Sequence, residues 1–116
     1  MASRHLQRVA SRLKFLISTV LQREMNDPRL GFLTVLEVKP TDDFREAKVY
    51  VSVLGSTGDR SKALHALEDA RGFIQKKIAK NLQLRNVPYL RFVLEEEQDR
   101  VARIEELLDE DKRDPG

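Results

Sequence analysis

The residues best suited to binding chemistry in this sequence are cations that follow a glycine. The stretch "DARGFIQKKIAKNLQLR", residues 69–85, has the pattern of one amphipathic helix interrupted by Gly72. A glycine inside a helix costs about 1 kcal/mol relative to alanine, so it indicates either a tolerated defect or a break. A glycine at a joint between two helices, followed by four cations, suggests a groove that binds RNA or DNA. The alternative is a kinked core helix with a solvated lysine face.

The small residues Ala70 and Gly72 flank Arg71 and would let the second helix leave at an angle. They would also let a nucleic-acid backbone pass close to the chain. In an earlier helical stretch, Arg8 and Arg12 lie one turn apart and form a basic ridge. The candidate nucleic-acid-binding residues are therefore Arg8, Arg12, Arg71, Lys76, Lys77, Lys80 and Arg85.

No group of residues indicates catalysis or a metal site. The two histidines, His5 and His65, have no serine or carboxylate partner at a recognisable catalytic spacing. His65 and Glu68 lie three residues apart, but zinc needs three or four ligands and no second cluster is visible. The absence of cysteine excludes disulfides, thiol catalysis and cysteine-ligated metals. We therefore expect no catalytic residue, no metal and no cofactor, and an enzyme is the weakest interpretation.

The stretch "GSTG", residues 55–58, has the form of the loop with which K-homology (KH) domains hold a nucleic-acid backbone. In KH domains this loop joins two helices, whereas here it follows a strand pattern and precedes a helix. We therefore interpret it as a turn. Neither glycine is followed by the Gly-Lys-Ser/Thr of a phosphate-binding loop.

Charge is unevenly distributed along the chain. Residues 95–116 hold ten acidic and four basic residues, a net charge of −6, and the other 17 basic and nine acidic residues give 1–94 a net charge of +8. A basic body suggests a polyanionic partner, although a solvated surface without a partner has the same composition. No apolar run is long enough for a membrane span, and the N-terminus lacks a secretory signal. An Arg- and Ser-rich transit peptide is the alternative there; we expect a cytoplasmic protein.

Hydrophobic spacing predicts the elements that position these residues. Apolar residues at three- and four-residue spacing predict a helix over 4–24, which Pro28 ends. Strands are predicted over 32–40, 47–54 and 89–95, the first two as an antiparallel hairpin. A helix is predicted from Asp59 or Ser61 to about residue 70, and it resumes after Gly72 to about Leu82.

These elements predict an α+β domain over residues 1–95, with a three-stranded sheet and helices packed on one face. Residues 96–116 form an acidic appendage, with a short helix predicted around residues 98–111 and a frayed end.

Three stretches resemble the bacterial ribosome-binding factor A family. They are "LQREMNDPRLGFLTV", "AKVYVSVLG" and "ALEDARGFIQKKIAKNLQLRNVPYLRF", and the resemblance runs from about Gln7 to Leu94. It implies a KH-like fold of type II order, α-β-β-α-kink-α-β. In that family an Ala-x-Gly kink replaces the G-x-x-G loop, and Ala70, Arg71 and Gly72 match it.

The resemblance also implies a non-enzymatic factor that binds the small (30S) ribosomal subunit and its 16S rRNA. Such factors assist late maturation and processing of that RNA, notably in the cold. We expect the protein to be a monomer that binds neither a membrane nor a small-molecule substrate. The chain departs from the family at Tyr89, where an acidic residue is common, and in its short acidic tail.

The sequence is also compatible with two other functions. One is a generic KH-like RNA-binding module that is not dedicated to the ribosome. The other is a structural interaction protein that binds another protein through its sheet or its tail helix.

Overall fold

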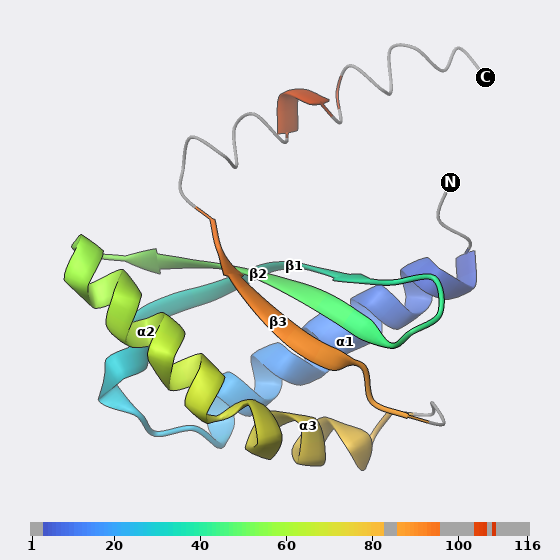
Figure 1. Cartoon of the computed structure of the whole chain (residues 1–116), viewed down its shortest axis with the longest axis horizontal. Helices are drawn as coiled ribbons and strands as arrows, with labels where there is room; N and C mark the ends of the chain where they lie inside the picture. Colours follow the sequence, from blue (N-terminus) through green and yellow to red (C-terminus); the bar gives the residue numbers. More distant parts are fainter. Residues whose placement is uncertain (1–3, 83–85, 96–103, 107, 109–116) are drawn as a thin grey trace.

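Helix α1, Arg4–Arg23, opens the fold and confirms the first predicted helix (Figure 1). The computed structural model of the chain describes residues 4–82, 86–95, 104–106 and 108. One stripe of α1 is buried because apolar side chains recur every three or four positions: Val9, Leu13, Leu16, Ile17, Val20 and Leu21.

A short 3₁₀ helix, η1 (Pro28–Leu30), turns the chain from α1 into the sheet. Asp27 caps it by accepting a hydrogen bond from the Arg29 backbone N–H at 2.9 Å. Proline suits the first helical position because its missing N–H would have no partner there. Gly31 ends the turn at φ 54, in the left-handed region that glycine tolerates best.

The sheet has three strands in the order β1 (Phe32–Pro40), β2 (Glu46–Leu54) and β3 (Tyr89–Leu94). Strands β1 and β2 pair antiparallel, which confirms the predicted hairpin. Strand β3 pairs with β2 in parallel, so the chain must cross over between them, and the helices after β2 make that crossover. The register of β1 and β2 shifts between Val35 and Glu37, at a one-residue bulge.

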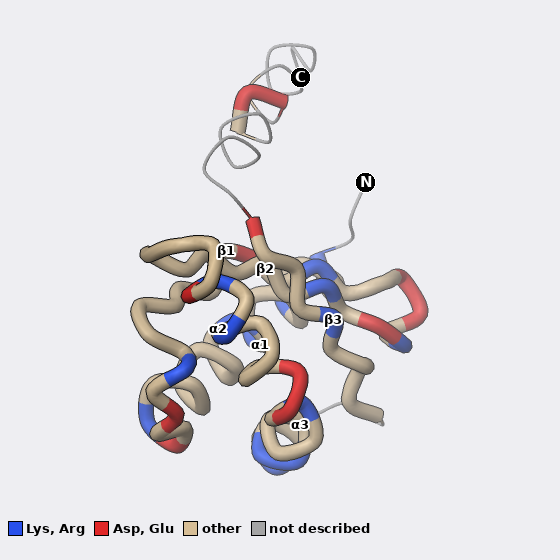
Figure 2. The backbone as a smooth tube through the Cα atoms, turned by 60° about the vertical axis from the view of Figure 1, so that its left-hand side comes forward, with Lys and Arg blue, Asp and Glu red and all other residues tan. Residues whose placement is uncertain are grey.

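The helices cover one face of the sheet, as predicted (Figures 1 and 2). Along β2 every second side chain is buried: Ala47, Val49, Val51 and Val53. They meet the inner faces of the helices, where Leu13, Ile17, Leu67, Ile74 and Ile78 are fully buried. The intervening β2 residues point to the opposite face, which we call the open face of the sheet.

Helix α2, Thr57–Asp69, begins earlier than the sequence analysis placed it. The prediction of a start at Asp59 or Ser61 was wrong because Ser56 and Asp59 form a capping box. The Asp59 N–H donates to Ser56 Oγ at 3.1 Å, and the Ser56 N–H donates to Asp59 Oδ2 at 2.9 Å. Gly58, predicted to belong to a turn before the helix, therefore lies in the first turn of α2.

Helix α3, Arg71–Ala79, follows α2 and leads toward β3. Within the described residues, no helix is both long and apolar enough to cross a lipid bilayer. Of the predicted tail helix, residues 104–106 and 108 are described and are helical. The rest of that segment and Arg85 lie outside the described residues.

Candidate nucleic-acid interface

The break between α2 and α3 is made by a single residue, Ala70. Its backbone has φ −91 and ψ 0, away from ideal helical values, and it caps both helices. The Ala70 N–H still donates to the Ala66 carbonyl at 3.0 Å, and its own carbonyl accepts from the Ile74 N–H at 2.9 Å. The chain therefore changes direction without leaving these backbone groups unpaired. The sequence placed the break at Ala70-Arg71-Gly72, and the structure narrows it to the first of these.

Gly72 lies inside α3, one residue beyond its first position. The glycines with positive φ in the described part of the chain are Gly31 and Gly55. A Cβ built on Gly72 would meet no atom within 4 Å outside its own helix. The fold therefore does not require glycine here. Its effect is on the surface, where it leaves an exposed stretch of backbone that another molecule can approach.

The outer side of α3 and its C-terminal cap carry the predicted lysines, which we call the lysine ridge: Lys76, Lys77 and Lys80. Ile74 and Ile78 are fully buried on the other side, so the ridge faces outward (Figure 2). Gly72, Lys76 and Lys80 follow one another at four-residue spacing and share one line along the helix. The exposed backbone at Gly72 and the cations therefore belong to one surface.

A hollow of about 310 Å³ separates the end of α3 from the second half of α1. Its lining residues are Leu16, Thr19, Val20, Arg23, Glu24, Lys77, Ile78, Lys80 and Asn81. Lys77 Nζ lies 3.6 Å from Glu24 Oε1, so one ridge lysine is partly neutralised. Arg23 also lines the hollow, although it was not among the residues predicted to bind nucleic acid. Arg23 follows Arg12 by 11 residues, close to three helical turns, and this spacing could have placed it on the same side of the helix.

Arg8 and Arg12 are exposed on the first half of α1. Arg12 lies one turn before Leu16, the first α1 residue that lines the hollow, and its guanidinium lies 5.8 Å from the centroid of the exposed Phe15 ring. The structure thus places Arg23, Lys77 and Lys80 around one hollow. Arg8 and Arg12 continue the α1 ridge beyond the hollow.

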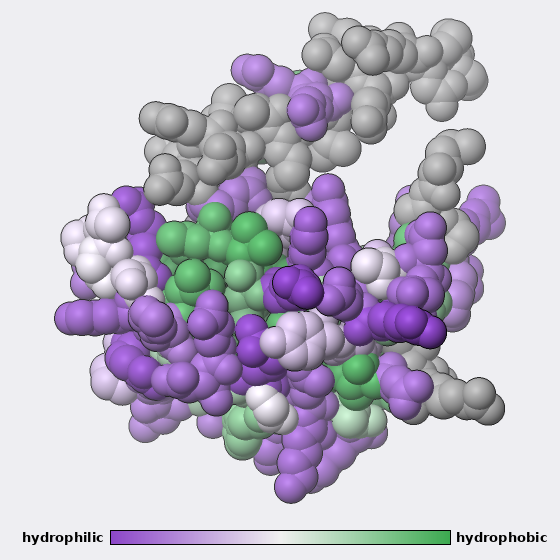
Figure 3. Space-filling view, in the orientation of Figure 1, coloured by the Kyte–Doolittle hydropathy of each residue, from purple (hydrophilic) through white to green (hydrophobic). Residues whose placement is uncertain are grey.

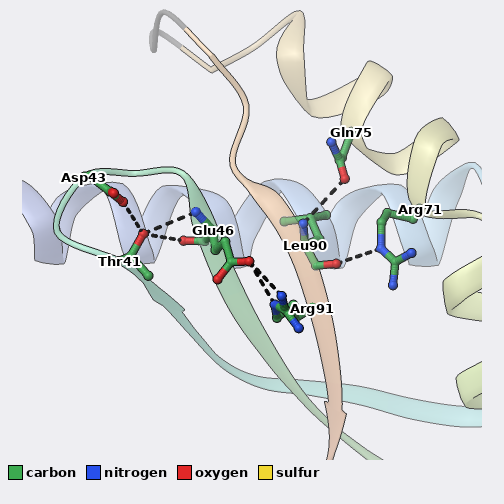
Figure 4. Close-up of polar contacts among 7 residues, drawn as sticks. All are labelled: Thr41, Asp43, Glu46, Arg71, Gln75, Leu90 and Arg91. Carbon is green, nitrogen blue, oxygen red and sulfur yellow. Dashed lines mark hydrogen bonds and ion pairs between the residues drawn. The ribbon is translucent and has the colours of Figure 1, made fainter.

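Arg71 is half-buried and bound within the protein (Figure 4). Its Nε donates to the Leu90 carbonyl of β3 at 2.7 Å, and its guanidinium lies 4.7 Å from the Tyr89 ring centroid. Gln75 accepts from the Leu90 N–H through Oε1 at 3.4 Å. The first turns of α3 are therefore fixed to β3, so the residue expected to contact phosphate also positions the break.

Arg29 holds the other side of the break. Its Nη1 lies 3.1 Å from Oδ2 of Asp69, the last residue of α2, and its Nη2 lies 2.8 Å from Asp27 Oδ2. Hydrogen bonds to Asp27 and then to Asp69 raise the pKa of Arg29 above its usual value. The turn before β1 is thereby tied to the end of α2.

An apolar surface lies between α2 and the C-terminal end of β3, away from the break. Figure 3 shows hydrophobic surface between α2 and β3, and these elements carry the partly buried Leu64 and Leu94. Lysines suit phosphates, whereas bases stack on aromatic rings, which Leu64 and Leu94 do not supply. In the described part of the chain, no group of three or more His, Asp or Glu residues could hold a metal ion.

Comparisons with known proteins agree on one family. The family model described as ribosome-binding factor A matches residues 5–108. A ribosome-binding factor A from Thermodesulfovibrio yellowstonii is 43% identical over 107 residues, which cover 92% of this chain and 90% of that protein.

Two structures of the same family are similar to this one. The crystal structure of ribosome-binding factor A from Thermus thermophilus has a TM-score of 0.70 at 28% identity, covering 77% of this chain and 94% of that one. A Thermus thermophilus RbfA homology model, fitted into the cryo-EM map of a 30S–RbfA complex, has a TM-score of 0.62 at 30% identity, covering 79% and 93%.

Proposed function

Because this chain belongs to the ribosome-binding factor A family, we propose that it is a non-enzymatic assembly factor that binds the small ribosomal subunit. It contacts 16S rRNA and assists late maturation of that RNA, including at low temperature, as a cytoplasmic monomer. The fitted 30S–RbfA complex of a relative supports the partner. Residues 1–95 form the binding domain, and residues 96–116 are an acidic appendage.

The observation that carries the proposal is the continuous surface formed by Gly72 and the lysine ridge. Phosphate contacts supply most of the sequence-independent affinity for RNA, and exposed lysines beside an accessible backbone suit them. Arg8, Arg12 and Arg23 extend the positive charge along α1. The predicted residue Arg85 stays a candidate contact.

The sharpest test removes the two ridge lysines for which no ion pair is described. Lys76→Glu/Lys80→Glu should abolish co-sedimentation with purified small subunits, while the circular dichroism spectrum and the melting temperature stay close to those of the wild type. Lys77 is left unchanged because it pairs with Glu24, and its reversal would set two carboxylates against each other. The matched control, Lys14→Glu/Lys62→Glu, reverses two exposed lysines on α1 and α2.

Normal sedimentation of the ridge variant would place the binding surface elsewhere. Fractionation of a cell extract separates the proposed function from a generic RNA-binding module. A maturation factor follows free small subunits, whereas a generic module distributes over many RNAs. Binding that survives ribonuclease would instead indicate a contact with protein alone.

A further inference from the structure

The open face of the sheet carries a row of three cations. In the β1–β2 ladder Lys39 is directly opposite Lys48, and in the β2–β3 ladder Lys48 is directly opposite Arg91. All three side chains are exposed. Neighbouring strands lie about 4.8 Å apart, so the row crosses the sheet over roughly 10 Å. We call these residues the sheet row.

This arrangement works against folding, because like charges directly opposite each other on paired strands are destabilising. Part of the charge is compensated, because Arg91 Nη2 lies 2.9 Å from Glu46 Oε1. Lys39 Nζ lies 5.7 Å from the Tyr50 ring centroid, a contact that leaves the lysine charge in place. Among the described residues, no ion pair involves either Lys39 or Lys48. Glu46 and Glu37, which is directly opposite Tyr50 on the same face, offset two of the three positive charges. The row and these carboxylates together keep a net charge of +1, which suits an anionic partner.

We propose that the sheet row is a second RNA-binding surface, in which Lys39, Lys48 and Arg91 contact phosphates of an RNA strand. Tyr50 lies two residues beyond Lys48 on β2 and so on the same face, and aromatic rings beside cations are the usual platform for an unpaired base. Charge complementarity and this neighbouring ring favour RNA over an acidic protein. The proposal rests on the proposed function for the identity of the RNA.

The sheet row and the lysine ridge lie on opposite sides of the domain. The ridge faces outward from the helical layer, whereas the row faces outward from the sheet (Figures 1 and 2). One flat RNA surface cannot reach both. The protein would therefore lie between two RNA segments and hold them at a distance set by its own two layers.

The test neutralises the opposed lysine pair. Lys39→Gln/Lys48→Gln should weaken binding to purified small subunits and to protein-free small-subunit rRNA on the order of tenfold, and should lower the slope of log K against log salt by roughly 1.4 to 1.8. Lys14→Gln/Lys62→Gln removes the same charge elsewhere and should leave the affinity within about twofold of the wild type and the salt slope unchanged, as expected of distant sites. The sheet-row variant should melt no lower than the wild type, because it removes a like-charge pair.

A ¹⁹F NMR signal from Tyr50 tests independently whether RNA contacts the open face. The chain has two tyrosines and no tryptophan, so protein labelled with fluorotyrosine gives two ¹⁹F resonances, and Tyr50→Phe assigns them. The Tyr50 resonance should shift when small-subunit rRNA is added. An unmoved resonance, together with unchanged affinity and salt slope in the lysine variant, would overturn the inference.

The other outcomes separate this inference from the proposed function. Weaker binding to subunits with unchanged binding to free rRNA would mean that the row docks an acidic protein, which contradicts the inference. Loss in the ridge variant alone would support the ridge and reject the row. Loss in the sheet-row variant alone would support the row and move the main surface away from α3.

Discussion

At the scale of single residues, the missing Cβ of a glycine can serve either binding or folding. Gly72 has open space where a Cβ would go, whereas a Cβ on Gly55 would lie 2.6 Å from Asp59 Oδ2. Gly55 also has φ 140, a conformation that other residues adopt with strain. Substitution at Gly72 should therefore change binding, and substitution at Gly55 should change stability.

We expect Gly72→Val to weaken co-sedimentation with small subunits while unfolding near the wild-type denaturant midpoint. The added side chain covers the exposed backbone of α3 but meets nothing within the protein. Gly72→Ala should be more stable than the wild type by up to about 1 kcal/mol. Normal subunit binding by Gly72→Val would show that the exposed backbone plays no part in recognition.

Gly55→Ala should destabilise the protein by about 1–3 kcal/mol, because it combines backbone strain with a clash against the capping carboxylate. Denaturant unfolding measures the change. Gly58→Ala is the matched control, since its Cβ would make only an ordinary contact with Ser56 Oγ at 3.7 Å. Equal stability of the two variants would contradict this assignment.

The carboxylate of Asp59 should also make the stability depend on pH. Hydrogen bonds from the Ser56 backbone N–H and then its hydroxyl hold the pKa of Asp59 below its usual range. Its contribution is therefore present above the unfolded pKa, about 3.9, and is lost as pH falls through the lower folded-state pKa. In urea titrations from pH 7 down to about 2, Asp59→Asn should show a shallower loss of stability than the wild type. A parallel pH dependence of the two proteins would argue against this contribution.

At the scale of elements, the direction of α3 depends on contacts at both ends of the break. Arg29 holds the end of α2, and Arg71 with Gln75 holds the start of α3 against β3. Arg29 reaches Asp69 from a distant part of the sequence. Loss of this contact should therefore open the last turn of α2 locally without unfolding the domain.

Arg29→Gln should speed hydrogen exchange at the Ala70 amide, because that amide closes the last turn of α2 and Asp69 would lose its partner. The global unfolding free energy should change little, since exposed ion pairs contribute little. Arg45→Gln removes the exposed Arg45–Asp43 pair in the β1–β2 hairpin and should leave the Ala70 amide unchanged. Equal exchange in both variants would show that Arg29 does not hold the break.

The sequence predicted these elements where the signal is local. The spacing of apolar residues predicted α1, and the alternation of apolar and polar residues predicted β2. The small residues around Arg71 predicted the break. The start of α2 was missed because the Ser56–Asp59 capping box was taken for a loop. The hydrogen bond from Arg71 to the Leu90 carbonyl joins residues 19 positions apart, so no local sequence pattern could have predicted it. The sheet row depends on strand register, which the bulge after Val35 shifts by one residue.

At the scale of the molecule, two charged surfaces on opposite sides should act independently. If about six cations contact phosphates, affinity for small subunits should fall on the order of a thousandfold between 50 and 200 mM salt. Neutralising Lys76 and Lys80 together with Lys39 and Lys48 should lower the salt slope by the sum of the two separate changes. Titrations at four or more salt concentrations measure the slopes. A combined slope equal to that of either pair alone would mean that one surface suffices.

The two outer strands of the sheet also affect how separate copies of the chain behave toward each other. An outer strand with free amides and carbonyls invites another chain to pair with it, the first step toward aggregation. In β3, Gln75 and Arg71 occupy the outward N–H and carbonyl of Leu90. In β1, the bulge after Val35 and the terminal Pro40 interrupt the regular ladder. These features discourage strand-to-strand association at both margins of the sheet.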